Sequence, residues 1–222
     1  MRYLKRIICL ANSRKMSGRC VAGLELERGR ISGWIRPVSS RPHGEISPND
    51  QNLADGSEPS LLDILEIHML EPCPDGCQTE NHLIDAEHYW GKTGVFPRQH
   101  LLQYCTAPNP LWVNGFRSLG GINDRIPELR AKSLPNSLVL IEPRQLTIEV
   151  RQGYGGRRQV RADFRVSGET YNLGVTDPAV ERQYSFLGEG QYAYRPRAVA
   201  CVSIGEPYRG YCYKLVASII PL

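Results

Sequence analysis

The stretch QVRADFRVSGETYNLGVTDPAVERQYSFLG, residues 159–188, contains in succession the signals of a strand, a turn, a second strand and a helix. In residues 159–166 every second residue is apolar, and this period of two predicts a strand with one buried face. The Ser-Gly pair that follows is a turn signal, and it leads into a second strand at 170–175. The segment Thr176-Asp177-Pro178 predicts a helix start, with the threonine or the aspartate as N-cap, and the helix should end near Gly188.

The segments on either side of this stretch also have strand character. Strands are predicted at 137–142, 145–151, 198–204 and 211–220. From residue 145 onward the order is therefore strand, strand, strand, helix, strand, strand. This is the order of an OB-fold, a five-stranded Greek-key barrel with a helix between its third and fourth strands. Other small barrels share such an order, so the order favours this fold without requiring it.

The N-terminal third has a similar opening of three strands. Strands are predicted at 4–10, 19–27, 30–38 and 61–70, and a short helix at 97–104. Residues 39–60 are rich in Ser, Pro, Asn, Asp and Gly, which is typical of a long loop. We therefore predict a mainly β protein with minor α content, made of two OB-like small β-barrels. The first would span 1–136 with a long Pro/Gly-rich insertion, and the second 137–222.

The composition of the 222 residues is that of a globular protein. Hydrophobic residues make up 41% and charged residues 23%. No apolar run approaches 18 residues, and the N-terminal run IICLA is too short for a secretory signal, so we expect no membrane association. The seven cysteines are an odd number and widely spread, which favours a reduced, cytoplasmic setting.

The charge is unevenly distributed along the chain. The formal net charge is +4, but residues 1–44 carry +8, residues 45–137 carry −7 and residues 138–222 carry +3. The basic residues are 22 Arg and only 5 Lys, which favours an anionic partner because the guanidinium grips phosphate bidentately. High genomic GC content explains the same excess equally well. The acidic middle could cover a basic face or be a solvated insertion.

Four motifs together resemble a known family. They are GWIRPVS at 33–39, ENHLID at 80–85, LGVTDP at 173–178 and YCYKLVASII at 211–220. Over nearly its whole length the chain is similar to the bacterial dual OB-containing domain family. The resemblance implies two OB-like barrels and an expected role in binding nucleic acid or nucleotides. It implies no catalytic residues that could be carried over to this chain.

The loop ANSRKMSGRC, residues 11–20, joins the first two predicted strands. Its Arg14, Lys15 and Arg19, with two serines and a glycine, suit phosphate oxygens because charged donors and backbone N–H groups can converge on them. The spacing of a Walker A loop is absent. The alternative is a solvated hairpin tip.

Aromatic and basic residues elsewhere suit a single-stranded nucleic acid. Trp34 and Arg36 would share one strand face, where the ring stacks on a base and the cation meets the backbone; alternatively Trp34 is core and Arg36 pairs with an acid. Tyrosines interleaved with arginines late in the chain could act likewise, or form a core with a solvated rim. The predicted binding residues are Arg14, Lys15, Arg19, Trp34, Arg36, Arg41, Arg157, Arg158, Tyr192, Tyr194, Arg195 and Arg197.

Metal and catalytic signals are weak. Cys73, Cys77, His82 and His88 have residue types that suit zinc, but their compact spacing fits no common finger, and a turn accounts for the two cysteines equally well. The nucleophile, metalloprotease and dinucleotide motifs are absent. We therefore expect neither a cofactor nor a metal, and we favour binding over catalysis while keeping an enzyme as an alternative.

The predicted function is non-catalytic binding of single-stranded DNA or RNA through a basic, aromatic-lined groove. One alternative is an enzyme acting on nucleic acid or nucleotide, with Glu80 and Asp85 as candidate acids. Another is a nucleotide-sensing or protein-interaction module that acts with a separate effector.

Overall fold

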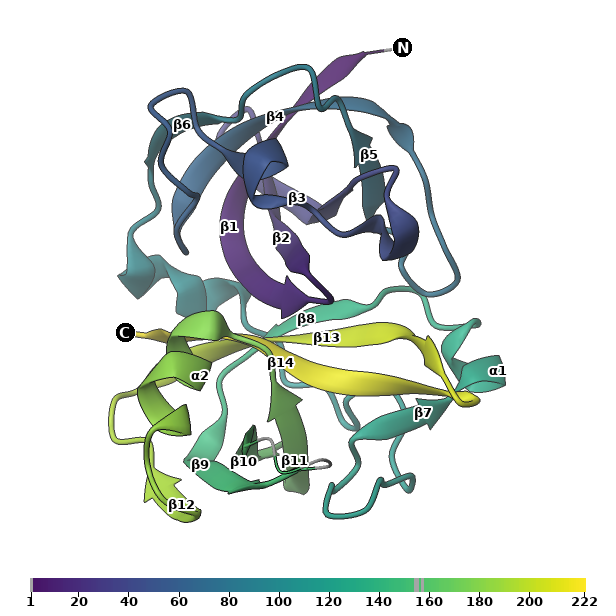
Figure 1. The fold of residues 1–222 in the computed structure, drawn as a ribbon, viewed down its shortest axis with the longest axis vertical. Helices are drawn as coiled ribbons and strands as arrows, with labels where there is room; N and C mark the ends of the chain where they lie inside the picture. The colour runs from purple at the N-terminus through teal and green to yellow at the C-terminus, as the bar shows by residue number, and fades with distance from the viewer. Residues whose placement is uncertain (1, 154–155, 157) are drawn as a thin grey trace. The chain divides into compact units, whose positions relative to one another are not determined.

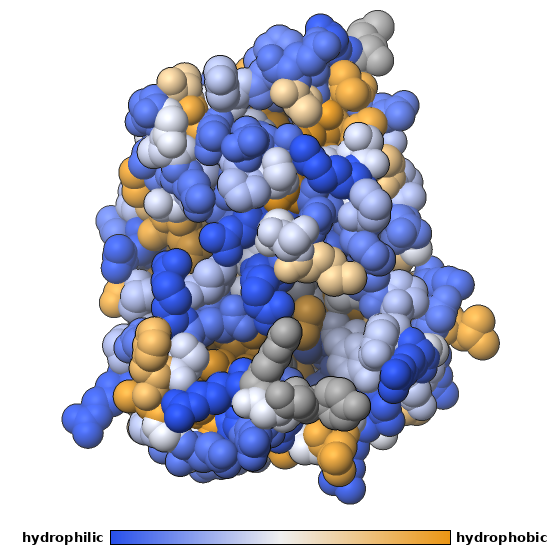
Figure 2. Space-filling model, viewed as in Figure 1, coloured by the Kyte–Doolittle hydropathy of each residue, from blue (hydrophilic) through white to orange (hydrophobic). Residues whose placement is uncertain are grey.

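The protein is described by a computed structural model, which covers residues 2–153, 156 and 158–222. The chain forms two compact units, Met1–His100 and Leu101–Leu222. Both are built mainly from β-strands (Figure 1), which confirms the predicted fold class. Hydrophilic side chains cover most of the surface shown in Figure 2, while the apolar strand faces are buried.

The first unit is a small closed barrel. Its sheet has the order β1-β2-β3-β5-β4-β6, and β1 also pairs with β4, so five strands return to the first. Strand β3 runs parallel to β5 and the other pairs are antiparallel. This is the strand order of an OB-fold. The strands are β1 (Tyr3–Lys15), β2 (Gly18–Glu27), β3 (Arg30–Val38), β4 (Asp63–Pro72), β5 (Asn81–Ile84) and β6 (Gly91–Val95).

Alternating side chains fill the interior of this barrel. In β4 the buried and partly buried positions alternate from Asp63 onward, so Leu65, Ile67 and Met69 enter the core with Trp90. The predicted long loop 39–60 replaces the usual helix with two short 3-10 turns, η1 (Pro42–Gly44) and η2 (Pro48–Gln51). Another 3-10 segment, η3 (Arg98–Tyr104), lies where the short helix was predicted.

The second unit repeats the OB order. Its sheet runs β12-β9-β10-β11-β14-β13-β8, with β11 parallel to β14, and β7 pairs with β14. The fourth barrel strand is split into β12, which pairs with β9, and β13, which pairs with β14. The strands are β7 (Arg125–Pro127), β8 (Leu138–Ile141), β9 (Arg144–Gln152), β10 (Arg158–Val166), β11 (Glu169–Val175), β12 (Gly190–Ala193), β13 (Ala198–Tyr208) and β14 (Tyr211–Pro221).

The predicted helix after β11 is present as α2 (Pro178–Ser185). Asp177 is its N-cap, because the carboxylate accepts the backbone N–H groups of Ala179 at 2.9 Å and Val180 at 3.4 Å. Val180 and Tyr184 face the barrel and pack into its apolar core. The helix therefore covers the interior of the second barrel, as in an OB-fold.

The segment 101–136 belongs to the compact second unit, although the sequence placed it in the first domain. Leu111 is fully buried in the core of the second barrel, and β7 pairs with β14. The short helix α1 (Glu128–Ala131) follows β7. The sequence did not predict that the segment 101–136 packs against the second barrel, because single buried residues between proline- and glycine-rich turns leave no periodic pattern.

Candidate anion-binding site

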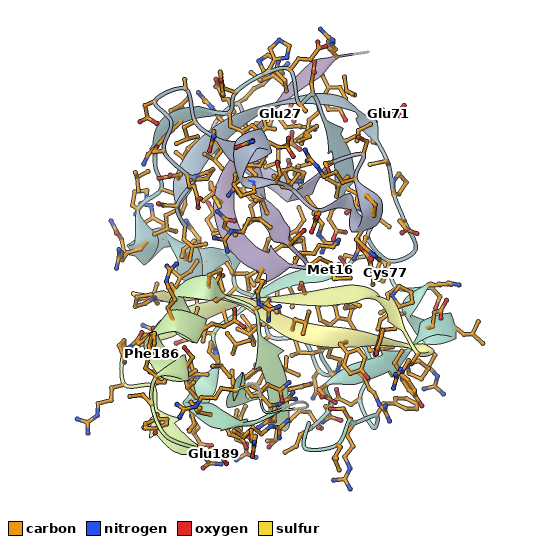
Figure 3. The ribbon with its side chains drawn as sticks, viewed as in Figure 1. Met16, Glu27, Glu71, Cys77, Phe186 and Glu189 are labelled. Carbon is orange, nitrogen blue, oxygen red and sulfur yellow. The ribbon has the colours of Figure 1, made fainter. Side chains whose placement is uncertain are left out.

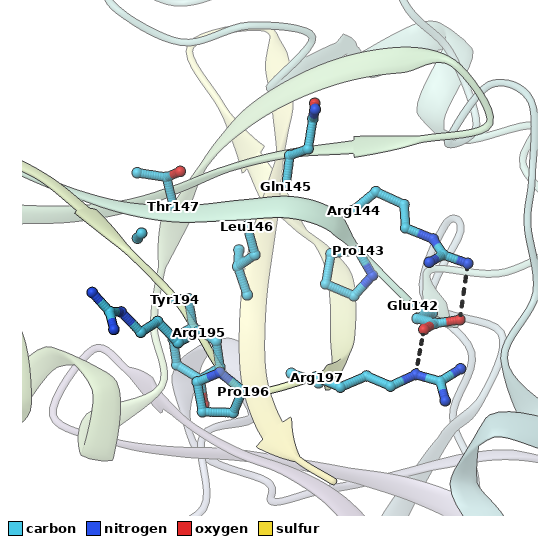
Figure 4. A pocket seen from close by; sticks show the side chains of 12 residues that line it. Glu142, Pro143, Arg144, Gln145, Leu146, Thr147, Tyr194, Arg195, Pro196 and Arg197 are labelled. Atoms are coloured by element: carbon cyan, nitrogen blue, oxygen red, sulfur yellow. Dashed lines mark hydrogen bonds and ion pairs between the residues drawn. The ribbon is translucent and has the colours of Figure 1, made fainter.

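A pocket of ≈ 480 Å³ lies in the second unit, where the start of β9 faces the link between β12 and β13 (Figure 4). Two sequence triplets form its charged lining, Glu142-Pro143-Arg144 and Arg195-Pro196-Arg197. The remaining lining residues are Gln145, Leu146, Thr147, Ala193, Tyr194 and Ala198. The pocket therefore brings together three arginines from two separate segments of the chain.

The break in the fourth barrel strand produces this pocket. Strand β12 pairs with β9 up to Ala193, and the backbone N–H of Tyr194 still donates to the carbonyl of Leu146 at 3.0 Å. Pro196 has no N–H to donate, which favours an interruption of the ladder at this point. Strand β13 begins at Ala198, and the link between them carries two exposed arginines.

One carboxylate organises two of the three cations. The Nε–H of Arg197 donates to Glu142 at 2.7 Å, and Nη2 of Arg144 lies 3.7 Å from the same carboxylate. The hydrogen bond from Arg197 lowers the pKa of Glu142, so the acid stays charged at neutral pH. Arg195 is the third cation of the lining and is exposed on the link between β12 and β13. Three cations against one anion make the lining positive, which favours an anionic ligand.

The two tyrosines predicted to stack on bases are half-buried. Tyr194 packs against the barrel core, and burial raises the pKa of its hydroxyl. Tyr192 also packs against the core, and its hydroxyl donates to the carbonyl of Gly188 at 2.8 Å. The structure therefore places Tyr194 in the wall of the pocket, beside the arginines.

The predicted phosphate loop at 11–20 is a tight hairpin. Strand β1 continues to Lys15 and β2 begins at Gly18, so only Met16 and Ser17 form the turn. The carboxylate of Glu45 accepts hydrogen bonds from the turn. The side chain of Arg19 lies 3.9 Å from Glu58.

The predicted surface pair of Trp34 and Arg36 is not formed. Trp34 is half-buried, and Arg36 is only 1% exposed, with Nη2 3.1 Å from the buried carboxylate of Glu80. Of the two interpretations offered for Arg36, a surface cation or the partner of an acid, the second is the one the structure shows. Arg41 is on the surface, where it forms an ion pair with Asp50. Glu80, one of the two candidate acids of the enzyme alternative, is therefore the ion-pair partner of a buried cation.

Two further arginines were predicted to line the groove. Arg157 lies outside the described residues. Nη1 of Arg158 donates to the carbonyl oxygens of Ser185, at 2.8 Å, and Leu187. This cation therefore caps the C-terminal end of α2, where the backbone carbonyls lack helical partners.

The candidate zinc ligands have different neighbours. His82 is 2.6 Å from the hydroxyl of Tyr3, whereas His88 is 3.2 Å from Asp85 and stacks on the ring of His68. Within the described residues, no three His, Cys, Asp or Glu side chains form a group that could hold a metal ion. Asp85, the second candidate acid, also forms an ion pair with Arg2 at 3.0 Å.

Comparison with known proteins identifies the family. The dual OB-containing domain family matches residues 5–219, which is nearly the whole chain. The chain belongs to this family. No curated protein and no solved structure matches it. Among the described helices, none is long and apolar enough to cross a membrane.

Membership of this family directs attention to the face of strands two and three, which OB-folds use for ligands. In the second barrel this is the β10–β11 face, and the segment 113–127 lies against it. Asp124 forms a buried ion pair with Arg161 at 2.9 Å, and Ile122 forms a β-bridge with Asn172. In the described part of this barrel, the chain itself therefore contacts the β10–β11 face, whereas the arginine pocket lies at the start of β9 and the link between β12 and β13.

Sequence reasoning missed Arg144 and Glu142. It selected Tyr194, Arg195 and Arg197 because aromatic and basic residues alternate around them, but it treated 137–151 only as strands. The signal that could have found the pair is the repeat of a proline between charged residues in the two triplets 142–144 and 195–197. Proline between charges marks a place where a strand stops and side chains leave the ladder.

Proposed function

We propose that this protein binds single-stranded nucleic acid without catalysing a reaction, and that the arginine pocket of the second unit holds phosphate groups of the strand. The observation that carries the proposal is the convergence of Arg144, Arg195 and Arg197 on one pocket with a single carboxylate. Guanidinium groups bind phosphate through paired, charge-assisted hydrogen bonds.

The arrangement is suited to binding because it is partly organised beforehand. Glu142 holds the guanidinium of Arg197 at 2.7 Å, which limits the conformations that this long side chain must lose when a ligand enters. Arg195 brings a further cation on the same link. The OB fold of the family is compatible with nucleic-acid binding, but it also hosts other ligands, so the proposal depends on the pocket.

The volume of the pocket supports a second candidate, a free nucleotide. At ≈ 480 Å³ it lies within the range of about 300–1,000 Å³ that small-molecule sites occupy. A nucleotide would use the same phosphate contacts, while its base would contact the wall that contains Tyr194. The two candidates differ in whether a longer strand binds more tightly than its monomer.

The test is fluorescence anisotropy with labelled single-stranded DNA and its RNA equivalent, at about 50 and about 200 mM salt. Each phosphate neutralised on a single strand contributes about −0.7 to the slope of log K against log salt. We expect Arg195→Ala/Arg197→Ala to make the slope less steep by about 1.4 and to weaken binding at low salt by about tenfold or more.

The matched control is Arg165→Ala/Arg182→Ala, which removes the same charge from exposed positions of β10 and α2 that do not line the pocket. The control should retain more of the affinity than the pocket variant. Equal losses would refute the pocket as the site. Binding of a mononucleotide as tightly as an oligomer would select the second candidate, and no binding of either at low salt would refute both.

A further inference from the structure

The tip of the β1–β2 hairpin gathers three hydrogen-bond donors on one carboxylate. Lys15 pairs with Gly18, so the turn is Met16-Ser17 (Figure 3). Ser17 donates from its hydroxyl to Oε1 of Glu45 at 2.8 Å and from its backbone N–H to Oε2 at 3.0 Å. The backbone N–H of Gly18 donates to Oε2 as well, also at 3.0 Å.

This donor set is an oxyanion site by its chemistry. Two successive backbone N–H groups and a hydroxyl point at the same charged group, and such backbone concavities bind carboxylates and phosphates alike. The hydrogen bond from the Ser17 hydroxyl and those from the backbone lower the pKa of Glu45, with a further contribution from Arg41. The tip therefore stabilises a negative charge at this position.

The backbone around the tip is fixed independently of the Glu45 side chain. Arg19 and Ile46 exchange two backbone hydrogen bonds, N–H to carbonyl, at 2.8 and 2.9 Å. A Cβ at Gly18 would lie 2.5 Å from the carbonyl oxygen of Ile46, so only glycine permits this approach. Rotation of the Glu45 side chain can consequently empty the donor set while the hairpin keeps its shape.

We propose that the β1–β2 tip is a phosphate-binding site whose resting occupant is the side chain of Glu45, which rotates into solvent when a phosphate group enters. The ligand class is a phosphate group, either inorganic phosphate or a phosphate of a nucleic acid. Because Glu45 lies on the surface, its displaced carboxylate regains water and leaves no buried charge. The site is in the first unit and does not depend on the function proposed for the arginine pocket.

The internal carboxylate should weaken phosphate binding by competition. A ligand that binds only the open form has an apparent affinity reduced by the fraction of molecules in that form. If Glu45 fills the tip for about nine-tenths of the time, its removal improves the apparent phosphate affinity about tenfold.

The test follows the backbone amides of Ser17 and Gly18 by two-dimensional ¹H–¹⁵N NMR during titration with inorganic phosphate, against chloride at the same ionic strength. In Glu45→Ala we expect saturable shifts of these two amides at about tenfold lower phosphate than in the unaltered protein. Glu58→Ala is the matched control, because it removes one acid near the same hairpin and leaves the three donors occupied. It should behave as the unaltered protein does.

Glu45→Gln is a second variant that keeps the side-chain volume and loses the charge. The phosphate concentration at which its two amides shift should lie between those of Glu45→Ala and the unaltered protein. A parallel titration with an oligothymidylate separates the sources: shifts with the oligomer at lower concentration than with phosphate assign the site to nucleic acid, and the reverse order assigns it to the free ion. If neither ligand shifts the two amides in a folded Glu45→Ala variant, the proposal is overturned. This readout is separate from the anisotropy of pocket variants, so either hypothesis can fail alone.

Discussion

Lys214 should make the stability of this protein depend on pH in an unusual direction. Its side chain, on β14, is fully buried. The ammonium donates to the carbonyl of Val113 at 2.7 Å and to Oδ1 of Asn114 at 3.2 Å, and it lies 5.3 Å from the ring centre of Tyr171. Burial lowers the pKa of Lys214 from 10.5 to about 7, because the opposing attraction of Asp124 is the smaller effect.

The direction in which the free energy of unfolding changes with pH depends on whether the folded or the unfolded state binds the proton more tightly. Between pH 7 and pH 10.5 the unfolded chain keeps Lys214 protonated while the folded protein releases the proton, so the free energy of unfolding rises with pH. Each pH unit contributes up to about 1.4 kcal/mol. Integration from pH 7 to pH 9 gives about 2 kcal/mol, because at pH 7 the folded lysine is still half protonated. This contribution is lost again as pH falls to the folded pKa.

The perturbation that isolates this effect is Lys214→Met, which keeps a long flexible side chain and removes the titrating group. Two cysteine thiols oppose the trend, because desolvation raises the pKa of the buried Cys9 to about 12 and of the partly buried Cys105 to about 11. The useful quantity is therefore the difference in unfolding free energy between the unaltered protein and the variant, since the thiols cancel in it.

Urea denaturation of both proteins at pH 7 and pH 9 measures this difference. We expect the unaltered protein to gain about 2 kcal/mol relative to Lys214→Met on going from pH 7 to pH 9. Lys214→Arg serves as a control that retains a charge at both pH values and should resemble the methionine variant in its pH dependence. Parallel pH profiles for lysine and methionine would refute the reasoning.

Two further predictions concern stability. Glu80→Gln removes the charge that pairs with the buried Arg36 and should lower the free energy of unfolding by about 3–5 kcal/mol. Arg41→Ala breaks only a surface ion pair with Asp50 and should lower it by less than about 1 kcal/mol. Similar losses for the two variants in urea denaturation would contradict this difference. Asp177→Ala should cost about 1–2 kcal/mol, because its carboxylate caps α2 and also accepts the N–H of Ile219 at 3.0 Å; an unchanged melting temperature would show that neither bond stabilises the fold.

The strand pattern of the second barrel was predictable from the sequence because its signals are local. Period-two alternation located β10, and the Asp177-Pro178 pair located the start of α2. The strand β12 was not predicted because it has only four residues, of which Tyr192 alone is half-buried, and this is too short for a periodic pattern. The boundary between the units also could not be predicted from the sequence, since it depends on which barrel the irregular segment 101–136 packs against.

The uneven distribution of charge along the sequence is explained in part by ion pairs that form only in the folded protein. The acidic residues of the middle segment neutralise basic groups of both flanking regions: Glu80 pairs with Arg36, and Asp124 pairs with Arg161. The count of charges could not distinguish this from a solvated insertion, because it does not place side chains on faces. The same applies to Glu45, whose contact with Ser17 joins residues 28 positions apart.

The sequence by itself determined the longer strands, the start of α2 and the family, because these depend on motifs formed by residues close together in the chain. Which arginines serve a site was decided by the tertiary structure. Arg36 became buried and Arg158 became a helix cap, whereas Arg195 and Arg197 met Arg144 across a broken strand. The physical reason is that a cation's role depends on its nearest carboxylate or carbonyl, and strand pairing brings those partners from distant positions in the chain.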